Sequence, residues 1–169
     1  MPISLNVPVP GRVKRLASEL EPDLYGFDRV RRRHTLVVKR LGERTPTEYA
    51  RLVPEVRRAI EGTAPFEVRV TGIETFERPA HGTEPVVYLA VEGSGLETLH
   101  DRLCETFEPV EGLEGESYVP HVTLARGGSA AARERLCERE VEPVVWAVNG
   151  LVLWDATHEE SAARFPLPA

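Results

Sequence analysis

The chain has 169 residues, of which 41% are hydrophobic, and a formal net charge of −6 at pH 7. This length can bury a real core, so residues 1–169 are predicted to form a single domain. The negative charge argues against a large nonspecific nucleic-acid surface, which would be basic, but it leaves room for a small basic pocket. No apolar run approaches the roughly 20 residues that span a bilayer, and no signal peptide is recognisable. We therefore expect a cytoplasmic protein without membrane association.

Hydrophobic periodicity and turn signals define the elements expected in the first half of the chain. Strands are predicted at 3–9, 34–40, 66–71 and 73–78, and helices at 11–20 and 46–60. The second helix has a clear start, because Thr45 can cap it, Pro46 suits its first position and Glu48 completes a capping box. Pro54 is expected to kink this helix or to divide it in two.

The second half continues with strands and helices of ordinary length. Strands are predicted at 86–91, 118–126 and 143–154, the last one interrupted at Asn149-Gly150, and helices at 96–107 and 129–138. The tail from Asp155 is expected to be irregular. This order favours an α+β fold with largely antiparallel pairing. A Rossmann fold is disfavoured because no glycine fingerprint follows the first strand, and no P-loop is present.

The strand at 118–126 carries the strongest candidate site. Alternate residues of a strand share a face, which groups Val119, His121, Thr123 and Ala125. An imidazole beside a hydroxyl, with Arg126 just downstream, suits an oxyanion such as phosphate. A polar pair at the edge of a sheet would look the same.

A second histidine, His34, opens the upstream hydrophobic strand, with Thr35 and Leu36 behind it and basic residues at the far end. Two such strands in one short chain suggest a duplicated unit. Each half would then supply one histidine to a shared cleft.

With these two strands, the chain resembles the 2H phosphoesterase superfamily, and within it the 2′-5′ RNA ligase and cyclic nucleotide phosphodiesterase-like branch. That family carries two His-x-Thr/Ser motifs, each followed by a hydrophobic residue, and His121-Val122-Thr123-Leu124 matches the second motif closely. The similarity extends over most of residues 3–154, although only the motifs are specific. The resemblance implies a bilobal, pseudo-duplicated α+β fold. Two mainly antiparallel sheets would surround a central cleft, with helices packed on their outer faces.

The first motif departs from the family pattern, because Leu36 stands where threonine or serine is expected and Thr35 is adjacent to His34. In a regular strand, Thr35 would point away from the side occupied by His34. A β-bulge would return Thr35 to the cleft. Without one, the first lobe would need another phosphate-binding group, for example an arginine.

The resemblance implies that His34 and His121 are catalytic and that Thr123, Arg126 and Thr35 bind substrate. One imidazole would take a proton from water or a ribose hydroxyl, and the other would protonate the leaving oxygen. A pKa near 6.5 suits histidine to both roles. The expected substrates are RNA ends and nucleotide 2′,3′-cyclic phosphates, turned over by a monomer without metal, ATP or another cofactor.

Two other functions remain compatible with these residues. The damaged first motif favours a domain that binds RNA termini or nucleotides with little or no turnover. The histidines would be merely structural in an α+β scaffold of unrelated function. The geometry at Thr35-Leu36 distinguishes the enzyme from the binding domain, and two imidazoles facing one cleft would exclude the scaffold.

The remaining histidines and both cysteines are interpreted without a catalytic role. His81 lies in a loop and is expected to be exposed, His100 is expected to pack on its helix, and His158 lies in the polar tail. None has the ligand spacing of a zinc site. Cys104 and Cys137 are expected to be free thiols.

Overall fold

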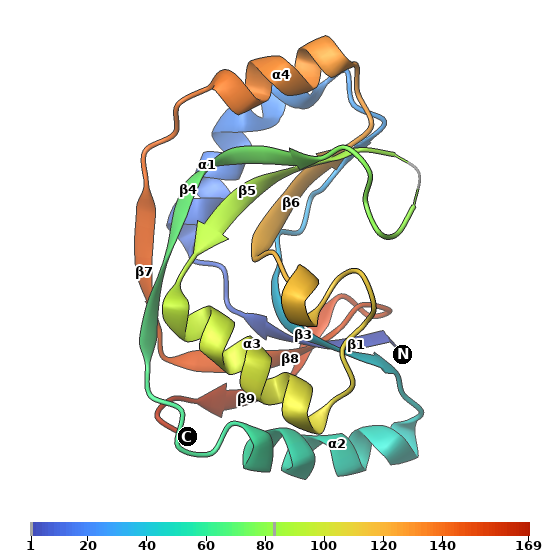
Figure 1. Ribbon diagram of the computed structural model, residues 1–169, viewed down its shortest axis with the longest axis vertical. Coiled ribbons are helices and arrows are strands. Elements are labelled where there is room, and N and C mark those ends of the chain that lie inside the picture. The colour runs from blue at the N-terminus through green and yellow to red at the C-terminus, as the bar shows by residue number, and fades with distance from the viewer. Residues whose placement is uncertain (1, 83) are drawn as a thin grey trace.

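The computed structural model describes residues 2–82 and 84–169, and within them it contains nine β-strands in two sheets and four α-helices (Figure 1). The first sheet has the order β3 (Leu36–Glu43), β1 (Pro2–Val7), β8 (Gly150–Asp155) and β9 (Glu160–Pro166). The second has the order β2 (Arg29–Val30), β6 (His121–Arg126), β5 (Val86–Glu92), β4 (Phe66–Phe76) and β7 (Val144–Val148). All pairings are antiparallel, so the prediction of an α+β fold with two antiparallel sheets is confirmed.

The helices are α1 (Gly11–Leu20), α2 (Pro46–Ala59), α3 (Ser94–Thr106) and α4 (Ala130–Glu138), with single 3₁₀ turns at Glu21–Leu24 and Gly115–Ser117. The capping box of α2 is confirmed: the backbone N–H of Glu48 donates to Thr45 Oγ1, and that of Thr45 donates to Glu48 Oε2. α2 runs unbroken through Pro54. Pro54 has no N–H to donate to the carbonyl of Ala50. Both residues are exposed, so water can hydrogen-bond to that carbonyl instead. No helix in the described part of the chain is long and apolar enough to cross a bilayer.

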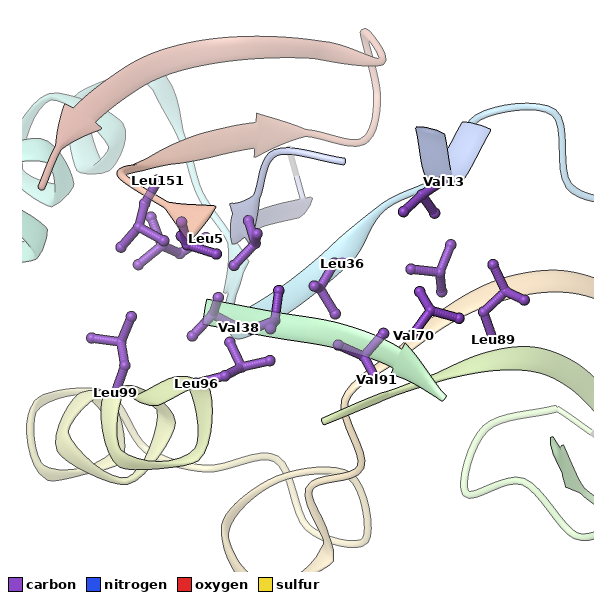
Figure 2. Close-up of a cluster of buried hydrophobic side chains, with 14 of the residues drawn as sticks. Leu5, Val13, Leu36, Val38, Val70, Leu89, Val91, Leu96, Leu99 and Leu151 are labelled. Atoms are coloured by element: carbon purple, nitrogen blue, oxygen red, sulfur yellow. The ribbon is translucent and has the colours of Figure 1, made fainter. Parts of the chain in front are cut away.

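One hydrophobic core joins both sheets to the helices (Figure 2). Leu5, Leu36, Val38 and Leu151 reach it from the first sheet, Val70, Leu89 and Val91 from the second, and Leu96 and Leu99 from α3. Because both sheets bury side chains in the same cluster, their relative position is fixed by close packing.

Several predicted boundaries are wrong, among them the start of the strand expected at 118–126, because β6 begins at His121. β3 begins at Leu36, so His34 and Thr35 precede the strand. The two strands expected at 66–78 are one strand, β4. Val70 pairs with Val91 and Gly72 pairs with Ala90, so Thr71 is an extra residue that the strand accommodates as a β-bulge. The tail forms β9 along β8 and buries Phe165, a pattern too short and polar to stand out in the sequence.

Candidate functional site

His121 and Thr123 lie on the face of β6 that is turned away from the main core. Their neighbours Val122 and Leu124 are fully buried in that core, and both polar side chains line a cavity of about 390 Å³. We call it the His121 cavity. Its volume lies in the range of small-molecule sites.

A β-bulge in β6 places Arg126 in the same cavity. Tyr88 pairs with Thr123 and Val87 pairs with Ala125, so Leu124 is an extra residue between them. The predicted position of Ala125 beside His121 is therefore wrong: the bulge turns Ala125 into the core, at 1% exposure. The same shift brings Arg126 to the side of His121 and Thr123.

The His121 cavity is cationic although the protein is acidic. Its polar lining consists of His121, Thr123, Arg126, Arg40, Arg78, His81, Ser117 and Tyr118. No carboxylate is among the described residues that line it. Three guanidinium groups without a facing carboxylate attract an anion, and guanidinium geometry matches phosphate oxygens. Phe76, Val86 and Val119 add an apolar wall.

The hydrogen bonding of His121 fixes which of its nitrogens can accept a proton. Nδ1 lies 2.7 Å from the carbonyl oxygen of Val119, which can only accept, so Nδ1 carries the hydrogen and Nε2 has the free lone pair. The rings of Phe76 and Tyr88 pack against the imidazole with centroids 5.2 and 5.3 Å away. These contacts hold the ring in one orientation.

The pKa of His121 is lowered from its ordinary value. Burial is the main cause, the hydrogen bond to Val119 opposes it, and Arg40, Arg31 and Arg126 lower the pKa further by repelling the imidazolium. His121 is therefore neutral near pH 7, as a general base must be.

A hydrogen-bonded network attaches the loop before β6 to β3. Tyr118 donates its hydroxyl hydrogen to the carbonyl of Val37, 2.8 Å away, and stacks on His100 at 3.7 Å. His100 donates from Nδ1 to the carbonyl of Val38 and accepts at Nε2 from the N–H of Gly115. His100 is fully buried, so its packing role is confirmed.

A buried ion pair reinforces the same connection. Lys39 Nζ lies 2.6 Å from Glu114 Oε1, and both side chains are fully buried. Glu114 also accepts from the N–H groups of Arg40 and Val110, while Lys39 donates to the carbonyl of Glu108. Burial alone raises the pKa of Glu114, but the hydrogen bonds from Arg40, Lys39 and Val110 outweigh it and leave this pKa below its ordinary value. The pair thus sets the distance between β3 and the loop that walls the cavity.

His34 and Thr35 line a different pocket, of about 520 Å³, which we call the His34 pocket. Its cations are Lys14, Arg32, Arg33 and Arg164, and no carboxylate is among its described lining residues. His34 also borders a small pocket against α1. Burial, then Arg31 and Lys14, lowers the pKa of His34, while Glu21 opposes this shift.

The two sites are neighbours without a shared lining residue. Asn6 of the His34 pocket pairs with Val37 of the His121 cavity across β1 and β3. The structure thus brings His121, Thr123 and Arg126 together in the His121 cavity, whereas His34 and Thr35 lie in the adjacent His34 pocket. The sequence did not identify Arg40, Arg78 and His81 as residues of this cavity. Arg40 comes from the irregular strand β3, and Arg78 and His81 come from the loop after β4, so no regular sequence spacing connects them.

No group of three or more His, Cys, Asp or Glu side chains in residues 2–82 and 84–169 is arranged to hold a metal ion. Cys104 and Cys137 are free thiols, as predicted.

Comparisons with known proteins agree with this fold. The structure is similar to TT0787 of Thermus thermophilus, with 25% identity, a TM-score of 0.70 and coverage of 99% of this chain and 98% of that one. It is similar to E. coli LigT complexed with 3′-AMP (16% identity, TM-score 0.70, covering 99% and 98%). Kluyveromyces marxianus Usb1 is more distant (10% identity, TM-score 0.59, covering 98% and 97%). No curated protein matches the chain.

A family model described as the 2′-5′ RNA ligase superfamily matches residues 35–160, about three quarters of the chain. The two antiparallel sheets and the cavity at His121-Val122-Thr123-Leu124 agree with that match. The chain therefore belongs to the 2′-5′ RNA ligase superfamily of 2H phosphoesterases.

Proposed function

We propose that this protein is a metal- and ATP-independent phosphoesterase that acts on RNA ends or cyclic nucleotides, and that the phosphoryl group reacts in the His121 cavity. The observation that carries the proposal is the grouping of His121, Thr123 and Arg126 in one cationic cavity, with Nε2 of His121 free to accept a proton. Family membership supports the phosphoesterase class.

Hydrolysis of a 2′,3′-cyclic phosphate illustrates the chemistry. His121 Nε2 takes a proton from water as the new P–O bond forms, and the bond from phosphorus to O2′ or O3′ breaks. Thr123 and Arg126 stabilise the charge that builds on the phosphoryl oxygens. The leaving oxygen must gain a proton. His34 is the candidate for this second transfer, and the His34→Ala variant decides whether it performs it.

The solved relatives support a nucleotide substrate. E. coli LigT has been crystallised with ATP, with 3′-AMP and with NADP⁺, which all contain a nucleotide phosphate. The arginines of the His121 cavity and its apolar wall of Phe76, Val86 and Val119 offer the same two features, charge for a phosphate and surface for a base.

The direct test is hydrolysis of nucleoside 2′,3′-cyclic phosphates and of a short RNA with a 2′,3′-cyclic end, in the presence of EDTA. We expect turnover by the wild type and a loss of about 10²–10⁴-fold in His121→Ala, the usual contribution of one acid–base group. Arg15→Ala, an exposed change on α1, serves as a control for folding and purity. Turnover that disappears with EDTA, or survives unchanged in His121→Ala, would contradict the proposal.

A second candidate function is supported by the separation of His34 from His121. If no proton donor faces the leaving oxygen, the protein binds RNA termini or nucleotides and turns them over slowly or not at all. This candidate predicts tight binding of a nucleoside 3′-phosphate that is weakened by Arg126→Gln, without measurable hydrolysis of any cyclic phosphate.

A further inference from the structure

The two halves of the chain can be aligned on their buried leucines. Leu124 follows Thr123 in β6 and Leu36 follows Thr35 at the start of β3, and both leucines are fully buried in the same core. Counting back two residues from each threonine gives His121 in one half and Arg33 in the other. On this alignment, His34 corresponds to the core residue Val122.

The burial along β3 supports the same register. Val37 lines the His121 cavity, while Leu36 and Val38 are buried in the core, so odd-numbered residues face the site here. Thr35 and Arg33 precede the strand and line the neighbouring His34 pocket, together with Arg32 and His34. His34 also borders the small pocket made with Ala17 and Ser18 of α1.

Arg33 is placed to meet a ligand. Its side chain is 61% exposed, and its guanidinium is held by Glu159, whose carboxylate is 3.2 Å from Nε and whose carbonyl oxygen accepts from an Nη. Lys14 and Arg164 line the same pocket. Asn6 on β1, which is next to β3, and Val152 and Trp154 on β8, which is next to β1, also line this pocket.

We propose that Arg33 and Thr35, rather than His34, are the counterparts of His121 and Thr123, and that Arg33 binds a substrate phosphate where a second proton-transfer imidazole would otherwise stand. This inference rests on the proposed function, because it assumes that a phosphoryl group reacts beside His121. In the first half of the chain, the residue that contacts the substrate would then be Arg33, which always carries a positive charge.

The chemical consequence is that the two halves of the site together supply a single proton-transfer group, His121. Arginine stays protonated at every relevant pH, so Arg33 neither takes a proton nor gives one up. In an in-line displacement, the attacking and leaving oxygens lie on opposite sides of phosphorus, so His121 serves only one of them. The leaving oxygen then takes its proton from solvent, and the wild type lacks a factor of about 10²–10⁴ in rate.

The test is a gain of function. Arg33→His supplies an imidazole at the aligned position, and we expect kcat for a 2′,3′-cyclic phosphate to rise at least about tenfold, with a new decrease at high pH as the added imidazolium loses its proton. Arg32→His, one residue away in the same pocket, is the matched control and should give no new basic limb. Arg33→Gln should raise KM, and Arg33→Lys should restore it in part.

The His34→Ala variant decides between the two assignments. We expect His34→Ala to lose much less kcat than His121→Ala, because the inference assigns no proton transfer to His34. A loss of about 10²-fold or more in His34→Ala, together with no gain in Arg33→His, would overturn the inference.

Binding measurements separate this inference from the proposed function. For a nucleoside 3′-phosphate, we expect both Arg33→Gln and Arg126→Gln to weaken binding. If only Arg126→Gln does so, the inference about Arg33 fails and the proposed function stands. If neither variant weakens binding and no form of the protein hydrolyses cyclic phosphates, the proposed function fails as well.

Discussion

At the scale of single residues, the environment of His121 explains why it suits a general base. Its Nδ1 is committed to the carbonyl of Val119, and the imidazolium form is disfavoured by burial and by Arg40, Arg31 and Arg126. The sequence revealed the pair His121 and Thr123 because residues two apart on a strand share a face. Arg126 was predicted too, because it lies just downstream on the same strand. Arg40 and Arg31 were not predictable, since they come from β3 and from the segment after β2.

One residue-scale prediction concerns Arg40. Replacing Arg40 with glutamine removes a positive charge that destabilises the imidazolium, so the pKa of His121 should rise toward its ordinary value. NMR titration of the histidine ring signals measures this shift directly. Arg15→Gln, an exposed change on α1, is the control and should leave the His121 titration unmoved. An unchanged pKa in Arg40→Gln would show that Arg40 does not act on His121.

His81 gives a second prediction at this scale. It lines the His121 cavity but is exposed in the loop between β4 and β5. We expect His81→Ala to reduce kcat/KM by less than about tenfold, by loosening substrate contacts, compared with about 10²-fold or more for His121→Ala. Equal losses in the two variants would instead make His81 a proton-transfer group.

At the scale of elements, β-bulges and a buried ion pair determine what faces the site. Strand alternation alone predicted that Ala125 lies on the same face as His121, but the bulge at Leu124 turns Ala125 into the core. β3 has register shifts opposite Ile3/Ser4 and Leu5/Asn6, so counting from its far end does not identify the residues that face the cavity. Helix α2 was predictable because its capping box is a local signal, whereas a bulge depends on the neighbouring strands.

The ion pair between Lys39 and Glu114 yields a stability prediction. Glu114→Gln leaves Lys39 as a buried charge without its partner, and such a change typically costs about 3–5 kcal/mol of unfolding free energy. The loop that holds Glu114 and walls the His121 cavity should become more mobile, so KM should rise. Denaturant unfolding measures the first effect and steady-state kinetics the second.

The double variant Lys39→Met/Glu114→Leu provides the control, because removing both charges avoids the uncompensated one. It should regain much of the lost stability. A single variant as stable as the wild type would contradict the role assigned to the pair.

At the scale of the whole molecule, the fold and one half of the site followed from the sequence. The order of strands and helices predicted an α+β fold with antiparallel pairing. The resemblance based mainly on the motif at His121 predicted the two sheets and the family to which the chain belongs. The relation between the two histidines was not predictable, because it depends on where β3 begins and on how α1 packs against the segment before it. In the structure, they line adjacent pockets.

The central claim is that His121 acts as the base, and its most direct test is the pH dependence of kcat/KM for a 2′,3′-cyclic phosphate, compared with the NMR titration of His121 in the same buffer. Because the pKa of His121 is lowered, activity should be present at neutral pH and lost as the pH falls through that pKa, below about 6.5. We predict that the acidic limb of the rate profile coincides with the His121 titration and shifts with it in Arg40→Gln. A rate profile that does not follow the titration of His121 would contradict the account.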